Sequence, residues 1–305
     1  MEVVVTGKYP AAADVAVLEL ADPTGAQLPP WTPGAHIEVE AAPGLSRCYS
    51  LTDGDDRMWR IAVLHDRNGR GGSSYIHRHL TPGTTVTVSR PRNNFPLQAA
   101  DRYLFVVGGI GITPILPMIR HAHQHGADWR LLYGGRRRTS MAFLDELSAY
   151  GDRVHIHPED EHGLLPLDRT FSDLPAGTLV YCCGPEPLLN AVGRHATGWP
   201  PGTLHIERFC SAPPAGGATF DIHLARANLT LTVPPDRSVL DVVEQAGITV
   251  LSSCRTGTCG TCETTVLGGL VDHRDTVLTD DERRESTTMM ICCSRSLTTL
   301  LTLDL

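Results

Sequence analysis

The stretch Cys254-Arg255-Thr256-Gly257-Thr258-Cys259-Gly260-Thr261-Cys262 decides one part of the fold. Its cysteines are spaced C-x4-C-x2-C, and a fourth, Cys292, follows 30 residues after Cys262. This spacing is typical of a [2Fe–2S] cluster, whose two irons need four thiolates. Gly257 and Gly260 lie between the three cysteines, where the backbone must approach sulfide without a Cβ. The sequence therefore predicts a [2Fe–2S] cluster bound by Cys254, Cys259, Cys262 and Cys292.

Two other uses of these cysteines fit the pattern less well. A structural zinc site usually has two C-x2-C pairs, whereas the second pair here is the adjacent Cys292-Cys293. Disulfides are not expected, because Met1-Glu2-Val3-Val4-Val5 is typical of a strand rather than a secretory signal. Spacing alone leaves open which of the adjacent cysteines is the ligand. We take Cys292 as the ligand and Cys293 as a packed neighbour.

Length, composition and charge exclude several classes of protein. The chain has 305 residues, enough for two or three domains, and is 41% apolar and 20% charged, as in an ordinary soluble protein. It has no run of about 18 apolar residues, so we expect no membrane span and a cytoplasmic location. The net charge of −8 argues against nucleic acid as a partner. Residues 219–305 hold 12 Asp and Glu against 7 Arg, a surface that either steers a basic partner or simply keeps the protein soluble.

The first 97 residues are rich in short strands. Alternating or apolar runs are separated by turns such as Thr32-Pro33-Gly34 and Thr81-Pro82-Gly83. The expected strands are Val15–Leu20, His36–Glu40, Arg47–Leu51, Trp59–Leu64 and Thr85–Ser89. Five or six strands at this spacing predict a small antiparallel β-barrel over residues 1–97.

From residue 98 to 210, strands alternate with helices. The expected strands are Leu104–Val107, Arg130–Tyr133, Arg153–His157 and Leu179–Cys182, and the expected helices are Pro114–Gln124, Ser140–Tyr150 and Glu186–Ala196. This alternation predicts an α/β domain with a parallel sheet that binds a nucleotide. A Pro/Gly-rich linker follows at 211–218. Residues 219–305 predict an α+β domain of β-grasp type, with a hairpin, a helix at Val239–Gln245 and the cysteine loop.

Three glycine-rich segments lie at the carboxyl ends of the α/β strands, where open sheets bind ligands. The first, Gly108-Gly109-Ile110-Gly111-Ile112-Thr113-Pro114, opens a helix whose N-terminus favours a pyrophosphate. It is not the G-x-G-x-x-G fingerprint, so alone it also fits a tight structural turn. The others are Tyr133-Gly134-Gly135-Arg136 and Cys183-Gly184-Pro185, and the three together favour nucleotide binding.

Two barrel segments carry groups that suit a phosphate and a flat ring. In Arg47-Cys48-Tyr49-Ser50, alternation places Arg47 and Tyr49 on one face, with a guanidinium for phosphate and a ring for stacking. Gly69-Arg70-Gly71-Gly72-Ser73-Ser74 is a loop or helix start able to hold a phosphate. Each segment alone also fits an ordinary surface.

The order of R-x-Y-S, G-R-G-G-S, G-G-I-G-I-T-P, Y-G-G-R, C-G-P and C-x4-C-x2-C…C resembles that of the phthalate dioxygenase reductase/vanillate demethylase reductase family, over essentially the whole chain. The resemblance implies a flavin barrel, an NAD(P)H domain and a C-terminal [2Fe–2S] ferredoxin domain, with FMN as the usual flavin rather than FAD. It also implies roles for individual residues. Those of the flavin site are Arg47, Ser73, Ser74, Gly71 and Gly72 at the phosphate, and Tyr49, Ser50 and Phe209 at the ring system. Those of the nucleotide site are Gly109, Gly111, Thr113 and Gly184, with Cys183 where nicotinamide meets flavin.

The expected function is that of an NAD(P)H-dependent reductase of a multicomponent oxygenase. Electrons would pass from NAD(P)H to flavin, to the cluster, and then to a Rieske-type oxygenase or a cytochrome P450, and we expect a monomer. Two alternatives are an NAD(P)H oxidase or flavin reductase with a regulatory cluster, and a non-enzymatic redox sensor. Arg136 opens the run Arg136-Arg137-Arg138, which fits either a 2′-phosphate site for NADPH or a solvated turn. The family resemblance favours NADH.

Overall fold

The computed structural model describes residues 1–42, 45–67, 69, 71–209, 217–252, 257, 260–275 and 277–305. The chain divides into two compact units, Met1–Glu207 and Arg208–Leu305. The predicted linker 211–218 lies outside the described residues apart from Gly217 and Ala218, and the predicted domain boundaries stay predictions. No helix in the described ranges is long and apolar enough to span a membrane.

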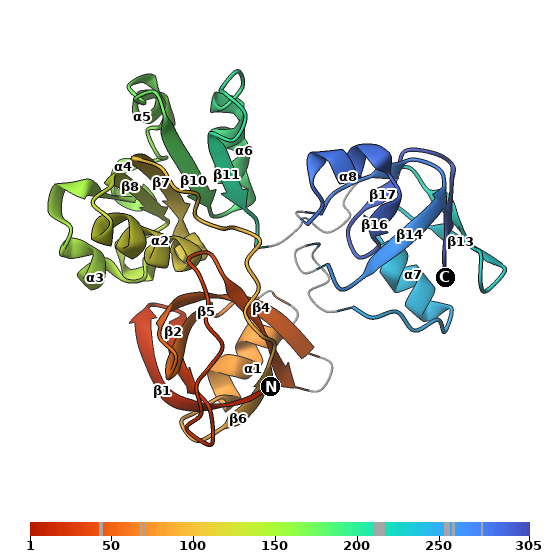
Figure 1. Ribbon diagram of the computed structural model, residues 1–305, viewed down its shortest axis with the longest axis horizontal. Helices are drawn as coiled ribbons and strands as arrows, with labels where there is room; N and C mark the ends of the chain where they lie inside the picture. The colour runs from red at the N-terminus through yellow and green to blue at the C-terminus, as the bar shows by residue number, and fades with distance from the viewer. Residues whose placement is uncertain are drawn as a thin grey trace. The chain divides into compact units, whose positions relative to one another are not determined.

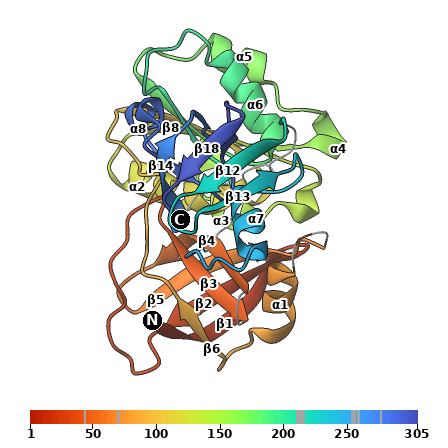
Figure 2. The ribbon, with the colours of Figure 1, turned by 90° about the vertical axis from the view of Figure 1, so that its right-hand side faces the viewer.

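A closed antiparallel barrel forms the first part of unit Met1–Glu207, at the red and orange end of the chain in Figure 1. Its strands, in the order β1-β2-β5-β4-β3-β6, are β1 (Glu2–Ala12), β2 (Val15–Ala21), β3 (His36–Ala42), β4 (Leu45–Gly54), β5 (Met58–Leu64) and β6 (Thr85–Val88). Helix α1 (Gly72–His79) lies beside the barrel strands (Figure 2), and its buried Ile76 packs into the barrel core. The predicted barrel is confirmed.

A five-stranded parallel sheet forms the second part of the same unit, in the order β11-β10-β7-β8-β9. Its strands are β7 (Arg102–Gly108), β8 (Asp128–Gly135), β9 (Val154–Pro158), β10 (Thr178–Cys183) and β11 (Leu204–Glu207). Its helices are α2 (Ile112–Gln124), α3 (Leu144–Ser148), α4 (Glu159–His162), α5 (Leu167–Ser172) and α6 (Glu186–His195). Leu189 and Val192 of α6 pack on one face of the sheet, and Trp129 of β8 meets His123 of α2 on the other. The predicted α/β domain is confirmed.

The helix predicted over Ser140–Tyr150 is shorter in the structure. Phe143 has a φ of 63°, in the left-handed region that no α-helix continues through, so α3 begins only at Leu144. Met141 and Ala142, just before it, are buried. A Cβ added to Gly135 would lie 2.4 Å from Cγ of Met141, so the segment covers the end of β8 instead of extending the helix.

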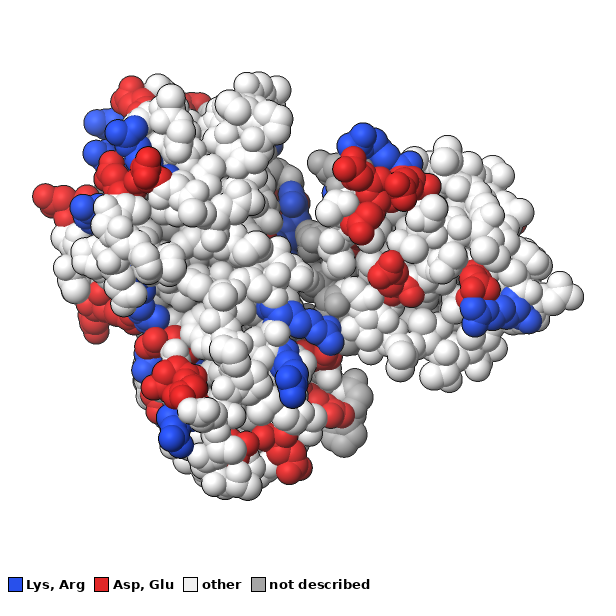
Figure 3. All heavy atoms as spheres, viewed as in Figure 1, with Lys and Arg blue, Asp and Glu red and all other residues white. Residues whose placement is uncertain are grey.

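Unit Arg208–Leu305 contains a mixed sheet in the order β13-β12-β18-β14-β16, with the small pair β15-β17. The strands are β12 (Phe220–Leu224), β13 (Leu229–Val233), β14 (Glu263–Gly268), β15 (Val271–Asp272), β16 (Thr288–Met290), β17 (Arg295–Ser296) and β18 (Leu300–Leu303). Helix α7 (Val239–Gln245) has the bounds that the sequence predicts, since Ser238 and Asp241 form a capping box at its start. Over α8 (Asp280–Glu285), acidic and basic side chains lie together (Figure 3).

Candidate cofactor sites

Arg47 of β4 lies directly against the start of α1. A Cβ added to Gly72 would stand 2.7 Å from Cγ and 3.1 Å from Nε of Arg47, so only glycine allows this approach. Gly71 precedes the helix with a φ of 86° and provides no side-chain cap. The first N–H groups of a helix have no acceptor within it, and they attract anions. A guanidinium beside such a helix start fits a phosphate group.

The hydroxyls of Ser73 and Ser74 are held in place by the segment that follows β5. The backbone N–H of Asp66 donates to Oγ of Ser73 at 3.1 Å, and Nε2 of His65 lies 3.1 Å from Oγ of Ser74. The His65 ring also stacks on His77, with 4.9 Å between centroids. The structure therefore brings the predicted phosphate residues Arg47, Gly71, Gly72, Ser73 and Ser74 to one corner of the barrel.

Tyr49 and Ser50 continue along β4 from that corner. Ser50 is buried, and Tyr49 is half-buried against the barrel core. Burial raises the pKa of the Tyr49 phenol well above its ordinary value, which further favours the neutral ring. One strand thus presents a cation, a neutral ring and a buried hydroxyl in sequence, and the flavin roles of these residues stay predictions.

The predicted nucleotide residues meet where the order of the parallel sheet reverses, between β7 and β10. A Cβ added to Gly111 would lie only 2.3 Å from the carbonyl oxygen of Cys183, and one added to Gly184 would lie 2.9 Å from the Gly108 nitrogen. The turns after the two strands are therefore in contact through their backbones. Open α/β sheets bind dinucleotides in the crevice at this switch point.

Side chains around the first glycine turn hold its backbone. The Thr113 hydroxyl donates to the carbonyl of Ile110 at 3.0 Å, so this buried side chain braces the turn. The Tyr133 hydroxyl lies 3.1 Å from the carbonyl oxygen of Gly109, to which it donates, and Gly109 has a φ of 55°. Tyr133 stands in a motif that the sequence indicated, but its contact with Gly109 was not predicted.

Cys183 and Glu207 lie side by side at the ends of β10 and β11. They are register partners, and Sγ of Cys183 donates to Oε2 of Glu207 at 3.9 Å. Burial raises the pKa of the Cys183 thiol, so the thiol keeps its proton. Desolvation raises the pKa of Glu207 to about 8, far above its ordinary 4.5. The sequence indicated Cys183, whereas Glu207 was not predicted as a site residue.

The arginines after β8 differ in their contacts. Arg138 forms hydrogen bonds to Glu161 at 3.1 Å and 2.9 Å. Arg136, the residue predicted to contact the nucleotide, is exposed just after β8. Phe209, predicted at the flavin, falls in the unit Arg208–Leu305. The roles of Arg136 and Phe209 stay predictions.

Two of the four predicted cluster ligands lie within the described residues. Cys262 and Cys292 are both buried, at the adjoining ends of β14 and β16, where the N–H of Ile291 donates to the carbonyl of Cys262 at 3.4 Å. The Cys293 thiol faces the carbonyl of Met290 at 3.7 Å, so it is engaged by its own turn. Cys254 and Cys259 lie outside the described residues, and the described residues alone contain no complete metal-binding group.

The described glycines of the cysteine segment suit a cluster. Gly257 and Gly260 have φ values of 74° and 77°, in the region that favours glycine. Two buried thiols on neighbouring strand ends are the donors that an iron–sulfur cluster needs. The described residues Cys262 and Cys292 therefore fit half of a [2Fe–2S] site.

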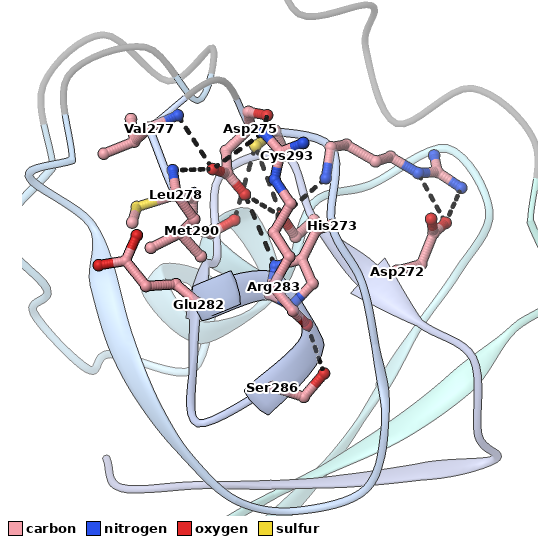
Figure 4. Close-up of polar contacts among 12 residues, drawn as sticks. Asp272, His273, Asp275, Val277, Leu278, Glu282, Arg283, Ser286, Met290 and Cys293 are labelled. Carbon is pink, nitrogen blue, oxygen red and sulfur yellow. Dashed lines mark hydrogen bonds and ion pairs between the residues drawn. The ribbon is translucent and has the colours of Figure 1, made fainter. Parts of the chain in front are cut away.

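A buried carboxylate, Asp275, holds the turn that carries Cys292. Its Oδ2 accepts the N–H groups of Val277 at 3.1 Å and Leu278 at 2.9 Å (Figure 4). Its Oδ1 accepts the hydroxyl of Ser294 at 3.4 Å, two residues after Cys292. These bonds join the segment after β15 to the cysteine turn.

Comparison with known proteins places the chain in a family. Residues 222–297 match the family described as "2Fe-2S iron-sulfur cluster binding domain". The chain is 41% identical to phenoxybenzoate dioxygenase subunit beta of Ectopseudomonas oleovorans, over 96% of this chain and 94% of that one. It matches a solved structure of phthalate dioxygenase reductase with a TM-score of 0.76 and 38% identity, covering 100% of this chain and 98% of that one. The chain belongs to the phthalate dioxygenase reductase family.

That solved reductase is described as a modular structure for electron transfer from pyridine nucleotides to [2Fe–2S]. A second structure, an intact type IV self-sufficient cytochrome P450 monooxygenase, matches with a TM-score of 0.83 and 44% identity. There the chain spans only about two fifths of the longer protein, 41% of its length. The architecture of our reductase is thus found both as a separate protein and as part of a larger one.

Membership in the family settles the general chemistry. The chain is an NAD(P)H-dependent oxidoreductase, the reductase component of an oxygenase system. Its cofactors are a flavin, a pyridine nucleotide and a [2Fe–2S] cluster. The predicted family, fold class and general function are confirmed.

Proposed function

We propose that this reductase uses NADH and FMN, and that it delivers single electrons through its [2Fe–2S] cluster to a Rieske-type oxygenase or a cytochrome P450. The observation that carries the proposal is the backbone contact of Gly111 with Cys183, at the switch point of a sheet that shares its unit with the barrel. When bound, the flavin accepts two electrons from the nucleotide and releases them one at a time. The cytoplasmic location and the monomeric state remain predictions from the sequence.

The barrel favours FMN over FAD because it offers one compact phosphate site. Arg47 and the first turn of α1 lie within a few ångströms of each other, as the Gly72 geometry requires. A terminal phosphate monoester fits such a site, because it accepts both the guanidinium and the helix N–H groups. Chromatography of the flavin released by heat would identify it. FMN supports the proposal, and FAD would contradict this part of it.

At the nucleotide crevice, the chain supplies positioning and a held proton. Thr113 and Tyr133 hydrogen-bond to the carbonyl groups of Ile110 and Gly109 and so brace the glycine turn, where the start of α2 favours a pyrophosphate. Cys183 keeps its proton on Sγ because the thiol is buried. A neutral thiol adds no negative charge of its own beside the crevice.

NADH is favoured over NADPH because part of the arginine run is already engaged. The Arg138 guanidinium is bound to Glu161 on the surface. This leaves Arg136 and Arg137 for any 2′-phosphate, and both are exposed to water, where a single ion pair is weak. Steady-state kinetics with both nucleotides test this choice, and a higher kcat/KM with NADPH would contradict it.

The route of electron exit is tested by Cys254→Ser. Loss of one thiolate should abolish reduction of a one-electron acceptor such as cytochrome c, while reduction of the flavin by NADH continues. Cys182→Ala, in the core of the parallel sheet, is the matched control and should keep both activities. If Cys254→Ser kept full turnover with dioxygen and with cytochrome c, the oxidase alternative would replace this proposal.

A further inference from the structure

Arg120, near the C-terminal end of α2, reaches from the nucleotide-binding part of the unit to the barrel. Its Nη1 donates to the carbonyl oxygen of Thr52 at 2.6 Å and lies 3.2 Å from Oδ1 of Asp53. Its Nε donates to Oε1 of Glu146 on α3 at 2.8 Å, and Nη2 contacts the same carboxylate. Only 19% of the Arg120 side chain is exposed. One guanidinium therefore joins α2, α3 and β4.

The carbonyl that Arg120 binds belongs to an irregular point in the barrel. Pairing between β4 and β5 shifts between Leu51 and Asp53, which leaves Thr52 as the extra residue of a β-bulge. A bulged residue falls out of the ladder, so its carbonyl needs another donor. Thr52 is fully buried, and Arg120 supplies that donor. The bulge is thus completed by a side chain from the other half of the unit.

The barrel anchors Asp53 in turn. Oδ2 of Asp53 accepts a hydrogen bond from Arg60 on β5 at 3.1 Å, and Arg60 lies 3.6 Å from Glu19 on β2. Arg120 is therefore bound to the end of an ion-pair network that crosses three barrel strands. Exposed single ion pairs are weak, but a network that shares its charges holds one geometry.

A second contact of α2 with this part of the unit lies two residues earlier, at Met118. A Cβ added to Gly34 would stand 2.9 Å from Cε of Met118 and 1.9 Å from the carbonyl oxygen of Phe95. Gly34, between β2 and β3, has a φ of 94°, and no larger residue fits there. Met118 and Arg120 thus give α2 two separate contacts with this part of the unit, from different sides of the helix.

Two of the three elements that Arg120 joins, α2 and β4, carry or adjoin proposed cofactor residues. Helix α2 starts next to Gly111 and Thr113, and a rise of about 1.5 Å per residue puts Arg120 about 10 Å along the axis from Thr113. Thr52 follows Ser50 on β4 by two residues, and β4 also carries Arg47 and Tyr49. A shift of α2 on β4 would move the nucleotide site relative to the flavin site.

We propose that Arg120 is a positioning residue for electron transfer from nucleotide to flavin, acting through the bulge carbonyl of Thr52. The proposal rests on the proposed function above. Among the described residues, the hydrogen bonds and ion pairs of Arg120 go to Thr52, Asp53 and Glu146 and to none of the proposed cofactor residues, so its removal leaves the groups that bind flavin and nucleotide chemically unchanged. The removal of Arg120 instead changes how the two sites are oriented relative to each other. Reactions between bound partners are sensitive to such a change, since a misplacement of about 1 Å can cost about 10²-fold in rate.

The test compares Arg120→Ala, Arg120→Lys and Arg138→Ala with the wild-type holoenzyme. Arg138 is the matched control, because it forms a similar two-bond pair with Glu161 that does not reach the barrel. The limiting rate of flavin reduction by NADH is measured anaerobically, together with the dissociation constants of flavin and NAD⁺. We expect Arg120→Ala to lower the limiting rate about 10- to 100-fold with both dissociation constants within threefold of wild type. Arg120→Lys should keep part of the limiting rate that Arg120→Ala loses, and Arg138→Ala should leave this rate unchanged.

Hydrogen–deuterium exchange provides a readout that does not depend on turnover. Amides of residues 50–54 should exchange at least tenfold faster in Arg120→Ala than in the wild type, and their exchange should be unchanged in Arg138→Ala.

A limiting rate of flavin reduction within twofold of wild type in Arg120→Ala would overturn the proposal. An equal loss of this rate in Arg120→Ala and Arg138→Ala would also overturn it. If Arg120→Ala does not fold, Asp53→Asn and Glu146→Gln each remove one partner and should lower the rate in the same direction. If the wild-type protein itself is not reduced by NADH, the proposed function fails instead, and exchange at residues 50–54 still decides whether Arg120 holds the bulge.

Discussion

Replacing Gly111 by alanine should weaken nucleotide binding by pushing apart the turns after β7 and β10. The φ of Gly111 is −59°, which suits alanine, so the backbone conformation itself adds no cost. The added Cβ would lie 2.3 Å from the Cys183 carbonyl oxygen, 2.5 Å from its carbon and 2.7 Å from the Gly184 nitrogen. Ordinary contacts of carbon atoms are about 3.5–4.0 Å, so one turn must move by about 1 Å. All three atoms are backbone, and no side-chain rotation relieves the clash.

The size of the effect follows from this displacement. Overpacking of this kind costs about 1–3 kcal/mol of stability. A shift of about 1 Å at a binding turn should also weaken NAD⁺ binding by about tenfold or more, since 1.4 kcal/mol is a factor of ten. Gly193→Ala in α6 is the matched control, because its Cβ would meet nothing within 4 Å. It should be neutral or stabilise the protein by up to about 1 kcal/mol.

Urea unfolding and NAD⁺ titration of the two variants test whether the contact between the two turns shapes the nucleotide site. We expect Gly111→Ala to unfold at lower urea concentration than Gly193→Ala, and to bind NAD⁺ more weakly while retaining its flavin. If Gly111→Ala matched Gly193→Ala in both stability and NAD⁺ affinity, the contact between the two turns would not shape the nucleotide site.

Three further predictions concern the other sites. Arg47→Ala should lower flavin affinity about 10- to 100-fold, since a hydrogen bond to a charged group is worth about 1.5–3 kcal/mol. Arg67→Ala is the control: it removes an exposed ion pair with Asp14 and should leave flavin affinity unchanged. Fluorescence titration of the apoprotein with flavin measures the affinity of each variant. Cys292→Ser should lose the visible absorbance of the cluster and Cys293→Ser should keep it, because the Cys293 thiol faces the Met290 carbonyl; the reverse result would exchange the two assignments. The pKa of Glu207 is raised in the folded state to about 8, so folding favours the protonated carboxyl. The contribution of Glu207 to the free energy of unfolding should therefore be complete below about pH 4.5 and lost as the pH rises through about 8. Glu207→Gln should flatten the pH dependence of the urea midpoint over that window, and an unchanged slope would show that Glu207 is not its source.

Local patterns were sufficient to predict most elements. Helix α7 was predicted with its observed bounds, because its apolar spacing and capping residues are all local. The barrel strands were also predicted from alternation between Pro/Gly turns. The helix over Ser140–Tyr150 was predicted too long, because the left-handed Phe143 depends on packing of Met141 over Gly135. Such a contact between segments leaves no periodic signal in the sequence.

Some residues of the candidate sites could also be predicted from local motifs, whereas others could not. Glycines in motifs, such as Gly72 and Gly111, could be found because close backbone approach demands that residue type. Tyr133, Glu207 and Arg120 could not, since each acts on a group that is distant in the chain. Arg120 binds the carbonyl of Thr52, 68 residues away, and no side-chain type marks a bulge carbonyl as needing a donor.

The central claim is that one chain carries electrons from NADH through a flavin to its cluster. An anaerobic titration of the purified protein with NADH, followed by absorbance, tests it most directly, with NADPH in a parallel cuvette. The account predicts that NADH bleaches both the flavin and the iron–sulfur bands. Bleaching of the flavin alone, with no cluster band present or changed, would contradict it.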